Sequence, residues 1–467
     1  MDGTSQIPVG DTLIWRAYGQ FVKRLLLGPN TPKEGLDYVY VCPPTEHGLR
    51  GGRPIPDAVT NSNVFSVADS LQRADSPLFT IHTDLSYFES LDNYLKAVTV
   101  KTITQEQKAE IKQAIKEQID AEEQRNIAKA AALAAWKHDL DAQANHRAFH
   151  DWAIDNADSY LELEEQVTLT SGQVDLLQSK YYGAMAGTLR EKRERLEKLA
   201  ADAKYSNPGY NMPCFIRDYA VDEAALDADH RVEDIDGRDL VYQPLYTIDG
   251  YESSCDSWIK GAAGDGTIVT LDLTSSRYDD WKELGHSQSI SRKANKFFFF
   301  FSKSSSTSTT ETHLNFNGSE WKQQTKITLY MTGPARVFNI TPGLWDDSGV
   351  RRTFPNLLEG EHDSALGLVR VSKILVGYEV SLKIRFAESL KTQVRNMVSQ
   401  AKWESNGGLR IFGFQFGPDQ ASGTSFTRDV NSVKYNETSN GLSLPASPPG
   451  CPVILGILGR KIGVELQ

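Results

Sequence analysis

The sequence has few cysteines, and no two of them stand at metal-ligand spacing. Its 467 residues include four cysteines, which lie far apart and form no Cys-x-x-Cys motif. That spacing excludes a zinc ribbon, and a disulfide framework is not expected in a chain of this length. We therefore interpret the cysteines as buried or isolated thiols.

Long apolar runs are also missing. No segment approaches the roughly 20 apolar residues that a membrane-spanning helix needs. The N-terminal residues MDGTSQIP lack the basic and apolar regions of a secretory signal peptide. We expect a protein that is soluble when made, and that is cytoplasmic or released by a route that uses no signal peptide.

The chain carries no excess of positive charge. Its formal net charge is −11 and its pI is near 5.4. A general nucleic-acid binder needs a basic face to displace counterions, so nucleic acid is not an expected partner. The stretch 190–195 mixes basic residues with glutamates, and we interpret it as a solvated helix face.

Motifs of familiar enzymes are absent as well. The chain has no Gly-x-Ser-x-Gly elbow and no Gly-x-Gly-x-x-Gly that opens a strand-helix unit. Active sites can also be assembled from dispersed residues. An enzyme of an unfamiliar family therefore stays open as an alternative.

The patterns that are present divide the chain into three parts. Residues 1–101 mix helix and strand signals, residues 102–206 are helical, and residues 207–467 contain strands and turns. An acidic linker opens the third part. We predict an α+β multi-domain protein with a mixed N-terminal segment, a long antiparallel helical hairpin or bundle, and a C-terminal antiparallel β-sandwich.

The helical part carries two capping boxes, at residues 104–107 and 170–173. In such a box the first residue caps the helix and the fourth residue bonds back to it. We therefore expect one helix to begin at each box. The first helical segment is about 90 Å long if unbroken, so we expect a break near residues 156–159.

The third part alternates apolar and polar residues in short stretches between turns. Residues 268–273, 326–331 and 378–386 alternate, and residues 407–417 form a strand rich in glycine and aromatic residues. A final apolar stretch covers residues 453–464 and predicts one or two more strands. This spacing favours the antiparallel sandwich.

Residues 296–331 are the most unusual segment. Five consecutive phenylalanines run into a Ser/Thr tract, and an Asn-Gly turn and a tryptophan follow. Five adjacent aromatic side chains need burial against protein or lipid, because exposure in water forgoes several kcal/mol. Ser/Thr-rich hairpins are typical of membrane-inserting segments, whereas the missing apolar alternation in 302–312 favours a buried strand and an exposed loop. The predicted contacts with a membrane or partner are Phe297, Phe298, Phe299, Phe300, Phe301 and Trp321.

A histidine group in the helical part is a candidate metal site. His146 and His150 are four residues apart, and His138 precedes His146 by eight, so all three lie near one helical stripe. Two imidazoles at this spacing can share one divalent metal. The alternative is a solvated or interhelical polar face.

A second candidate for metal or acid/base chemistry is the acidic region 218–239. Its many carboxylates suit Ca²⁺ or Mg²⁺, but the twelve-residue pattern of an EF-hand loop is not met. A charged surface linker is the competing interpretation.

The leading functional prediction is a toxin-like or membrane-surface-acting binding protein, with pore formation as one form of that activity. The helical hairpin, the 296–331 segment, or both would engage a lipid membrane. One alternative is an enzyme with a metal or acid/base site at the histidines or at 218–239. The other is a scaffold that forms homo-oligomers.

Overall fold

The structure is a computed structural model of the chain. It describes residues 9–42, 48–53, 55–81, 85–99, 104–141, 149–182, 185–197, 199, 206–215, 240–273, 281–286, 300–304, 309–313, 323–347, 349–403, 407–411, 414–416, 430–447 and 449–463.

The helices gather in the first half of the chain. The α-helices are α1 Val9–Leu27, α2 Asp57–Ala68, α3 Tyr87–Ala97, α4 Gln105–Asp141, α5 Phe149–Asn156, α6 Asp158–Tyr182, α7 Met185–Glu197, α8 Tyr251–Ile259, α10 Val350–Thr353 and α11 Lys391–Trp403. Short 3₁₀ helices are η5 Trp281–Leu284, η7 Glu388–Leu390 and η8 Val430–Ser432.

Strands gather in the second half of the chain. They are β1 Asp37–Val41, β2 Asn211–Phe215, β3 Leu240–Pro244, β4 Tyr246–Ile248, β5 Thr267–Leu271, β6 Phe300–Ser304, β7 Thr309–His313, β8 Lys326–Met331, β9 Arg336–Pro342, β10 Val369–Gly377, β11 Ser381–Arg385, β12 Gly407–Ile411, β13 Phe414–Phe416, β14 Lys434–Asn436, β15 Gly441–Leu444 and β16 Val453–Lys461.

These strands form four sheets, and each named strand pair is antiparallel. The orders are β1-β16-β10-β9-β4, β14-β15-β11-β8-β5, β13-β12-β6-β7 and β2-β3. The predicted mixture of helices with antiparallel sheets is therefore confirmed.

Strand β16 is buried on both of its faces. Val453 and Leu455 point into one core cluster, and Ile454 and Ile457 belong to another. The first cluster also holds residues of α1 and of the β8 and β11 strands, and the second holds residues of α2, α3 and α8. A strand covered on both sides reads as a continuous apolar run rather than an alternating one, which is why 453–464 looked so apolar.

The first and last parts of the chain share one sheet and one core. Strand β1 pairs with β16 over Asp37↔Arg460 to Val41↔Gly456. Trp15 and Val39 lie in the same core cluster as Leu329. Residues on both sides of position 101 thus contribute to one hydrophobic core cluster.

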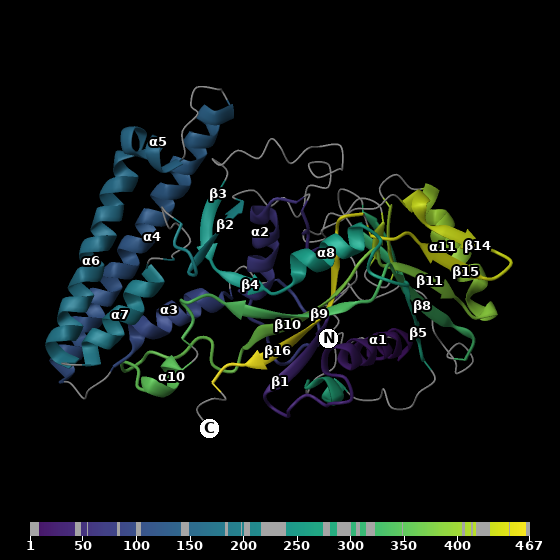
Figure 1. Ribbon diagram of the computed structural model, residues 1–467, viewed down its shortest axis with the longest axis horizontal. Helices are drawn as coiled ribbons and strands as arrows, with labels where there is room; N and C mark the ends of the chain where they lie inside the picture. Colours follow the sequence, from purple (N-terminus) through teal and green to yellow (C-terminus); the bar gives the residue numbers. More distant parts are fainter. Residues whose placement is uncertain are drawn as a thin grey trace.

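Helices α4 and α6 lie side by side, away from the two five-stranded sheets (Figure 1). Ile111 near the start of α4 packs with Leu177 near the end of α6, and Trp136 near the end of α4 packs with Tyr160 near the start of α6. The two helices therefore run in opposite directions. We call α4, α5 and α6 together the arm, and the sheets with α1, α2, α3 and α8 the body.

Two local predictions for the arm are confirmed. The Thr104 hydroxyl accepts from the backbone N–H of Gln107 (3.3 Å), and the Gln107 side chain accepts from the backbone N–H of Thr104 (3.0 Å), so this capping box opens α4. The expected break falls at Ala157, between the end of α5 and the start of α6.

The second predicted capping box is wrong. Thr170 lies inside α6, and its hydroxyl donates to the backbone oxygens of Gln166 and Val167, both at 3.0 Å. A threonine inside a helix satisfies its hydroxyl in this way, so the same residue types serve either as a cap or as an interior position. No helix begins at residue 170.

Candidate functional site

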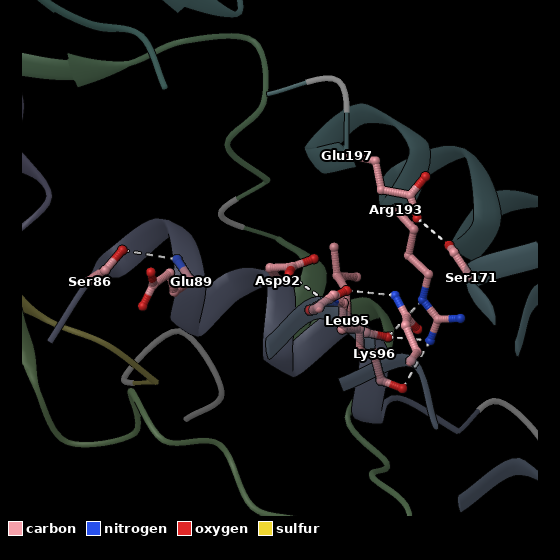
Figure 2. Close-up of polar contacts among 10 residues, drawn as sticks. Ser86, Glu89, Asp92, Leu95, Lys96, Ser171, Arg193 and Glu197 are labelled. Carbon is pink, nitrogen blue, oxygen red and sulfur yellow. Dashed lines mark hydrogen bonds and ion pairs between the residues drawn. The ribbon is translucent and has the colours of Figure 1, made fainter. Parts of the chain in front are cut away.

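The arm meets the body at α3. Ser86 caps the N-terminus of α3, because its hydroxyl accepts from the backbone N–H of Glu89 at 3.0 Å (Figure 2). Tyr87, Leu91 and Leu95 are buried in the core of the body. An N-cap of this kind satisfies one of the orphan donors of the first turn. The capped and buried helix gives the arm a fixed platform.

Arg193 of α7 joins the arm to the last turn of α3. Its side chain is 5% exposed. Its Nε donates to the backbone oxygen of Leu95 (3.0 Å), and its Nη2 donates to that of Lys96 (3.1 Å), as Figure 2 shows. Carbonyls at a helix C-terminus lack helical partners, and a cation there also suits the helix dipole. Arg193 therefore caps α3 from outside.

The same guanidinium also binds α6. Its Nη1 donates to the side-chain oxygen of Gln178 and lies 3.7 Å from a carboxylate oxygen of Asp175. Burial raises the pKa of Asp175, while the charge of Arg193 opposes that rise. One side chain on α7 thus contacts α3 and α6 together.

Lys96 adds a second bridge, from α3 to α4. Its Nζ lies 2.9 Å from a carboxylate oxygen of Asp92 and 2.9 Å from one of Glu122. Burial by itself lowers the pKa of Lys96, but the charges and hydrogen bonds of Asp92 and Glu122 raise that pKa by more. Lys96 stays charged and holds the middle of α4 against α3.

A small polar pocket lies inside this junction. The space open to the centre of a water molecule is about 10 Å³, which corresponds to roughly one water. That space is too small for an organic substrate, and the residues around it join α3, α4, α6 and α7. The lining residues are Asp92, Lys96, Gln118, Ser171, Val174, Asp175, Arg193 and Glu197.

Two adjacent aspartates extend the junction into the body. Asp346 accepts from the Tyr87 hydroxyl at 2.7 Å and pairs with Arg370 at 3.2 Å. Asp347 forms an ion pair with Lys192 of α7. Burial, and next the charge of Asp346, raises the pKa of the Tyr87 phenol well above its usual value, so that phenol acts as a donor. The loop between β9 and α10 therefore holds body and α7 together.

The sequence-based interpretation of residues 190–195 is wrong for one position. Arg190 and Arg195 are exposed and pair with glutamates one turn away, as a solvated face would. Arg193 is buried between Leu189 and Leu196, which are 0% and 1% exposed. Arg193 comes four residues after one leucine and three before the next, so it lies on the apolar stripe of the helix. That spacing is the sequence signal that could have predicted its burial.

The structure describes part of the phenylalanine run. Phe300 and Phe301 open β6, where Phe301 pairs with Leu409 of β12 and with Thr312 of β7. Strands β6 and β7 form an antiparallel hairpin from the Ser/Thr tract. Phe297, Phe298, Phe299 and Trp321 lie outside the described residues.

The predicted metal ligands are only partly described. His138 is 84% exposed near the end of α4, with its Nδ1 3.6 Å from Asp139. His150 is half-buried in α5, and His146 and the region 218–239 lie outside the described residues. Among the residues that the structure does describe, no three histidine, cysteine or acidic side chains gather as a metal would need. The metal site stays a prediction.

All four cysteines are buried thiols. Burial raises the pKa of Cys214 to about 12 and that of Cys255 to about 11. The thiolate is the nucleophilic form, so these two thiols are inert at neutral pH.

The comparisons with known proteins give no lead. No family model, no curated protein and no solved structure matches the chain. Within the described part of the chain, no helix is both long enough and apolar enough to cross a bilayer.

Proposed function

We propose that the protein is a toxin-like binding protein that acts at a membrane surface, with the 296–331 segment as its lipid-binding element. In this proposal the chain is organised as a mixed N-terminal part, a helical hairpin formed by α4 and α6, and a C-terminal β-sandwich. The helical hairpin is long enough to contact a surface at a distance from the sheets, because the 37 residues of α4 extend roughly 55 Å at 1.5 Å per residue.

The observation that supports this proposal is the β6–β7 hairpin. The phenylalanine run enters β6 at Phe300, and the following residues 302–304 pair with residues 309–311 of β7. A strongly aromatic segment therefore leads directly into a paired Ser/Thr hairpin. Aromatic side chains beside such polar strands suit the boundary between acyl chains and head groups.

The net charge of the protein determines how its binding should depend on the charge of the lipid head groups. A net charge of −11 gives no attraction to anionic lipids. Binding would then depend on apolar burial and would be at least as strong on phosphatidylcholine vesicles as on vesicles that also contain phosphatidylserine, because the anionic lipid repels a negatively charged protein. Pore formation would add release of a trapped dye.

The test is co-sedimentation of the full chain with both kinds of vesicle. We expect the wild-type protein to pellet with each, and Phe300→Asp with Phe301→Asp to abolish pelleting, because a charge at the bilayer boundary opposes apolar burial. Leu366→Asp is the matched control, since Leu366 lies between α10 and β10, outside the segment, and is 59% exposed. Wild-type protein that stays in the supernatant with both vesicles would contradict the proposal.

A further inference from the structure

One side of α6 is covered by none of the described elements. Five exposed residues lie along it, at spacings of four, three, four and four, which places them on one side of a helix. The opposite side carries buried Tyr160, Val174 and Leu177 against α4. Figure 1 shows α6 at the outer edge of the molecule. We call this set the α6 outer face: Glu165, Leu169, Gly172, Leu176 and Lys180.

The centre of the α6 outer face is apolar and open. Leu169 is 68% exposed and Leu176 is 63% exposed. Between them, a Cβ built on Gly172 would have no atom within 4 Å, so the helix backbone is accessible to a close neighbour. Two exposed leucines seven residues apart, with a glycine between them, give protruding side chains beside a recess, which is the kind of surface on which helices pack.

The ends of the α6 outer face carry opposite charges. Glu165 stands before the leucines and Lys180 stands after them, and both are exposed. Lys180 also stacks over the ring of Tyr181, with its Nζ 4.7 Å from the ring centroid.

This pattern is complementary to its own reversed copy. If a second α6 runs antiparallel, Leu169 meets Leu176 of the second copy, and Glu165 meets Lys180 of the second copy. Both pairings share one midpoint, between Gly172 and Gln173, so one two-fold axis satisfies them together. A parallel arrangement would instead place each charge opposite its like and is disfavoured.

We propose that two copies of this chain associate through the α6 outer face as an antiparallel, two-fold symmetric pair. The contact is small, because a stable interface has roughly 20–30 residues a side. The dissociation constant is therefore expected on the order of 100 µM, and the pair forms at high local concentration. This inference does not depend on the proposed membrane activity.

A charge-reversal series in sedimentation equilibrium of the full chain tests the pairing. We expect Glu165→Lys alone and Lys180→Glu alone each to weaken association about tenfold, because each creates two like-charge pairs across the axis. The double variant Glu165→Lys with Lys180→Glu restores opposite pairs and should return within about threefold of wild type. Both positions are exposed, so we expect these variants to fold like the wild type. Wild type that remains monomeric at about 1 mM, or a double variant as weak as the singles, overturns the proposal.

Crosslinking tests the direction. Gly172→Cys places a thiol beside the axis and should give a covalent dimer with a short bismaleimide, since the four native thiols are buried. Glu165→Cys is the matched control, because antiparallel packing separates its two copies by roughly 22 Å along the axis. Equal crosslinking of both variants, or crosslinking of Glu165→Cys alone, overturns the antiparallel pair.

Discussion

Arg193 on α7 donates from its Nε to the backbone oxygen of Leu95 at 3.0 Å, and this bond joins α7, the helix that follows the arm in the chain, to the last turn of α3. The same guanidinium holds Gln178 and lies near Asp175 on α6. Removing it leaves carbonyls, an amide and a carboxylate without their charged partner. Arg193 is therefore a central link in the junction between arm and body, beside the Lys96–Glu122 and Lys192–Asp347 ion pairs.

Arg193→Ala should destabilise the protein by about 3–5 kcal/mol, the cost of breaking a buried charged cluster on one side. Arg190→Ala is the matched control on the same helix. Arg190 is 59% exposed and forms an ion pair with Glu194 on the helix surface, so its loss should cost less than about 0.5 kcal/mol. Urea unfolding of both variants measures the difference. Equal stability of the two would show that the junction carries little energy.

Truncating a buried side chain in the cluster where α4, α5 and α6 meet should unfold the arm locally. Trp136 is 0% exposed and packs with Trp152 and Tyr160, so Trp136→Ala should cost about 3–5 kcal/mol. Hydrogen exchange should speed up in the second half of α4 and in α5, while β16 keeps its protection. Ile127→Ala, at a 66% exposed position of α4, is the control. Faster exchange in β16 as well would mean that arm and body unfold as one unit.

Sequence patterns predicted the elements whose signal is local. Residues 326–331 alternate within one strand, and β8 has those bounds. The capping box at Thr104 needs only four residues, and it forms as predicted. The leucine stripe around Arg193 could have indicated its burial, but its partners could not be predicted from sequence. Leu95 and Asp175 lie on other helices, and a run of mixed charges has the same pattern on a surface as at a junction.

His286 should make stability depend on pH near neutrality. The ring is 0% exposed, with Nδ1 3.0 Å from the backbone oxygen of Ala74 and Nε2 2.9 Å from that of Val39. Burial lowers the pKa of His286, and the two carbonyls oppose that shift only in part. The unfolded chain therefore takes up the proton first. The stabilising contribution is present above about pH 6.5 and is lost as the pH falls from there toward the folded value.

We expect the free energy of unfolding of wild type to fall between about pH 7 and pH 5.5, and His286→Gln to show a smaller fall over that range. The difference between the two proteins isolates this one group. A fall of the same size in both proteins would assign the pH dependence to other residues.

Asp69 should act with the opposite sign at lower pH. It is buried, and its Oδ1 accepts from the Tyr246 hydroxyl (2.7 Å) and from the backbone N–H of Phe88 (2.9 Å). Burial raises the pKa of Asp69, and these hydrogen bonds only partly offset it. The charged carboxylate thus costs stability at neutral pH, and that cost disappears as the pH falls through the folded pKa. Wild type should gain stability relative to Asp69→Asn on acidification, as thermal unfolding at several pH values would show. A constant difference between the two proteins would contradict this.

The most direct test of the membrane proposal places an environment-sensitive fluorophore in the segment itself. The native thiols are buried, so Ser302→Cys in β6 can be labelled alone, and Asn436→Cys on exposed β14 is the matched control. The proposal predicts a blue-shifted and stronger emission from the label at residue 302 when phosphatidylcholine vesicles are added, with no change at residue 436. Unchanged emission at residue 302 would contradict the account.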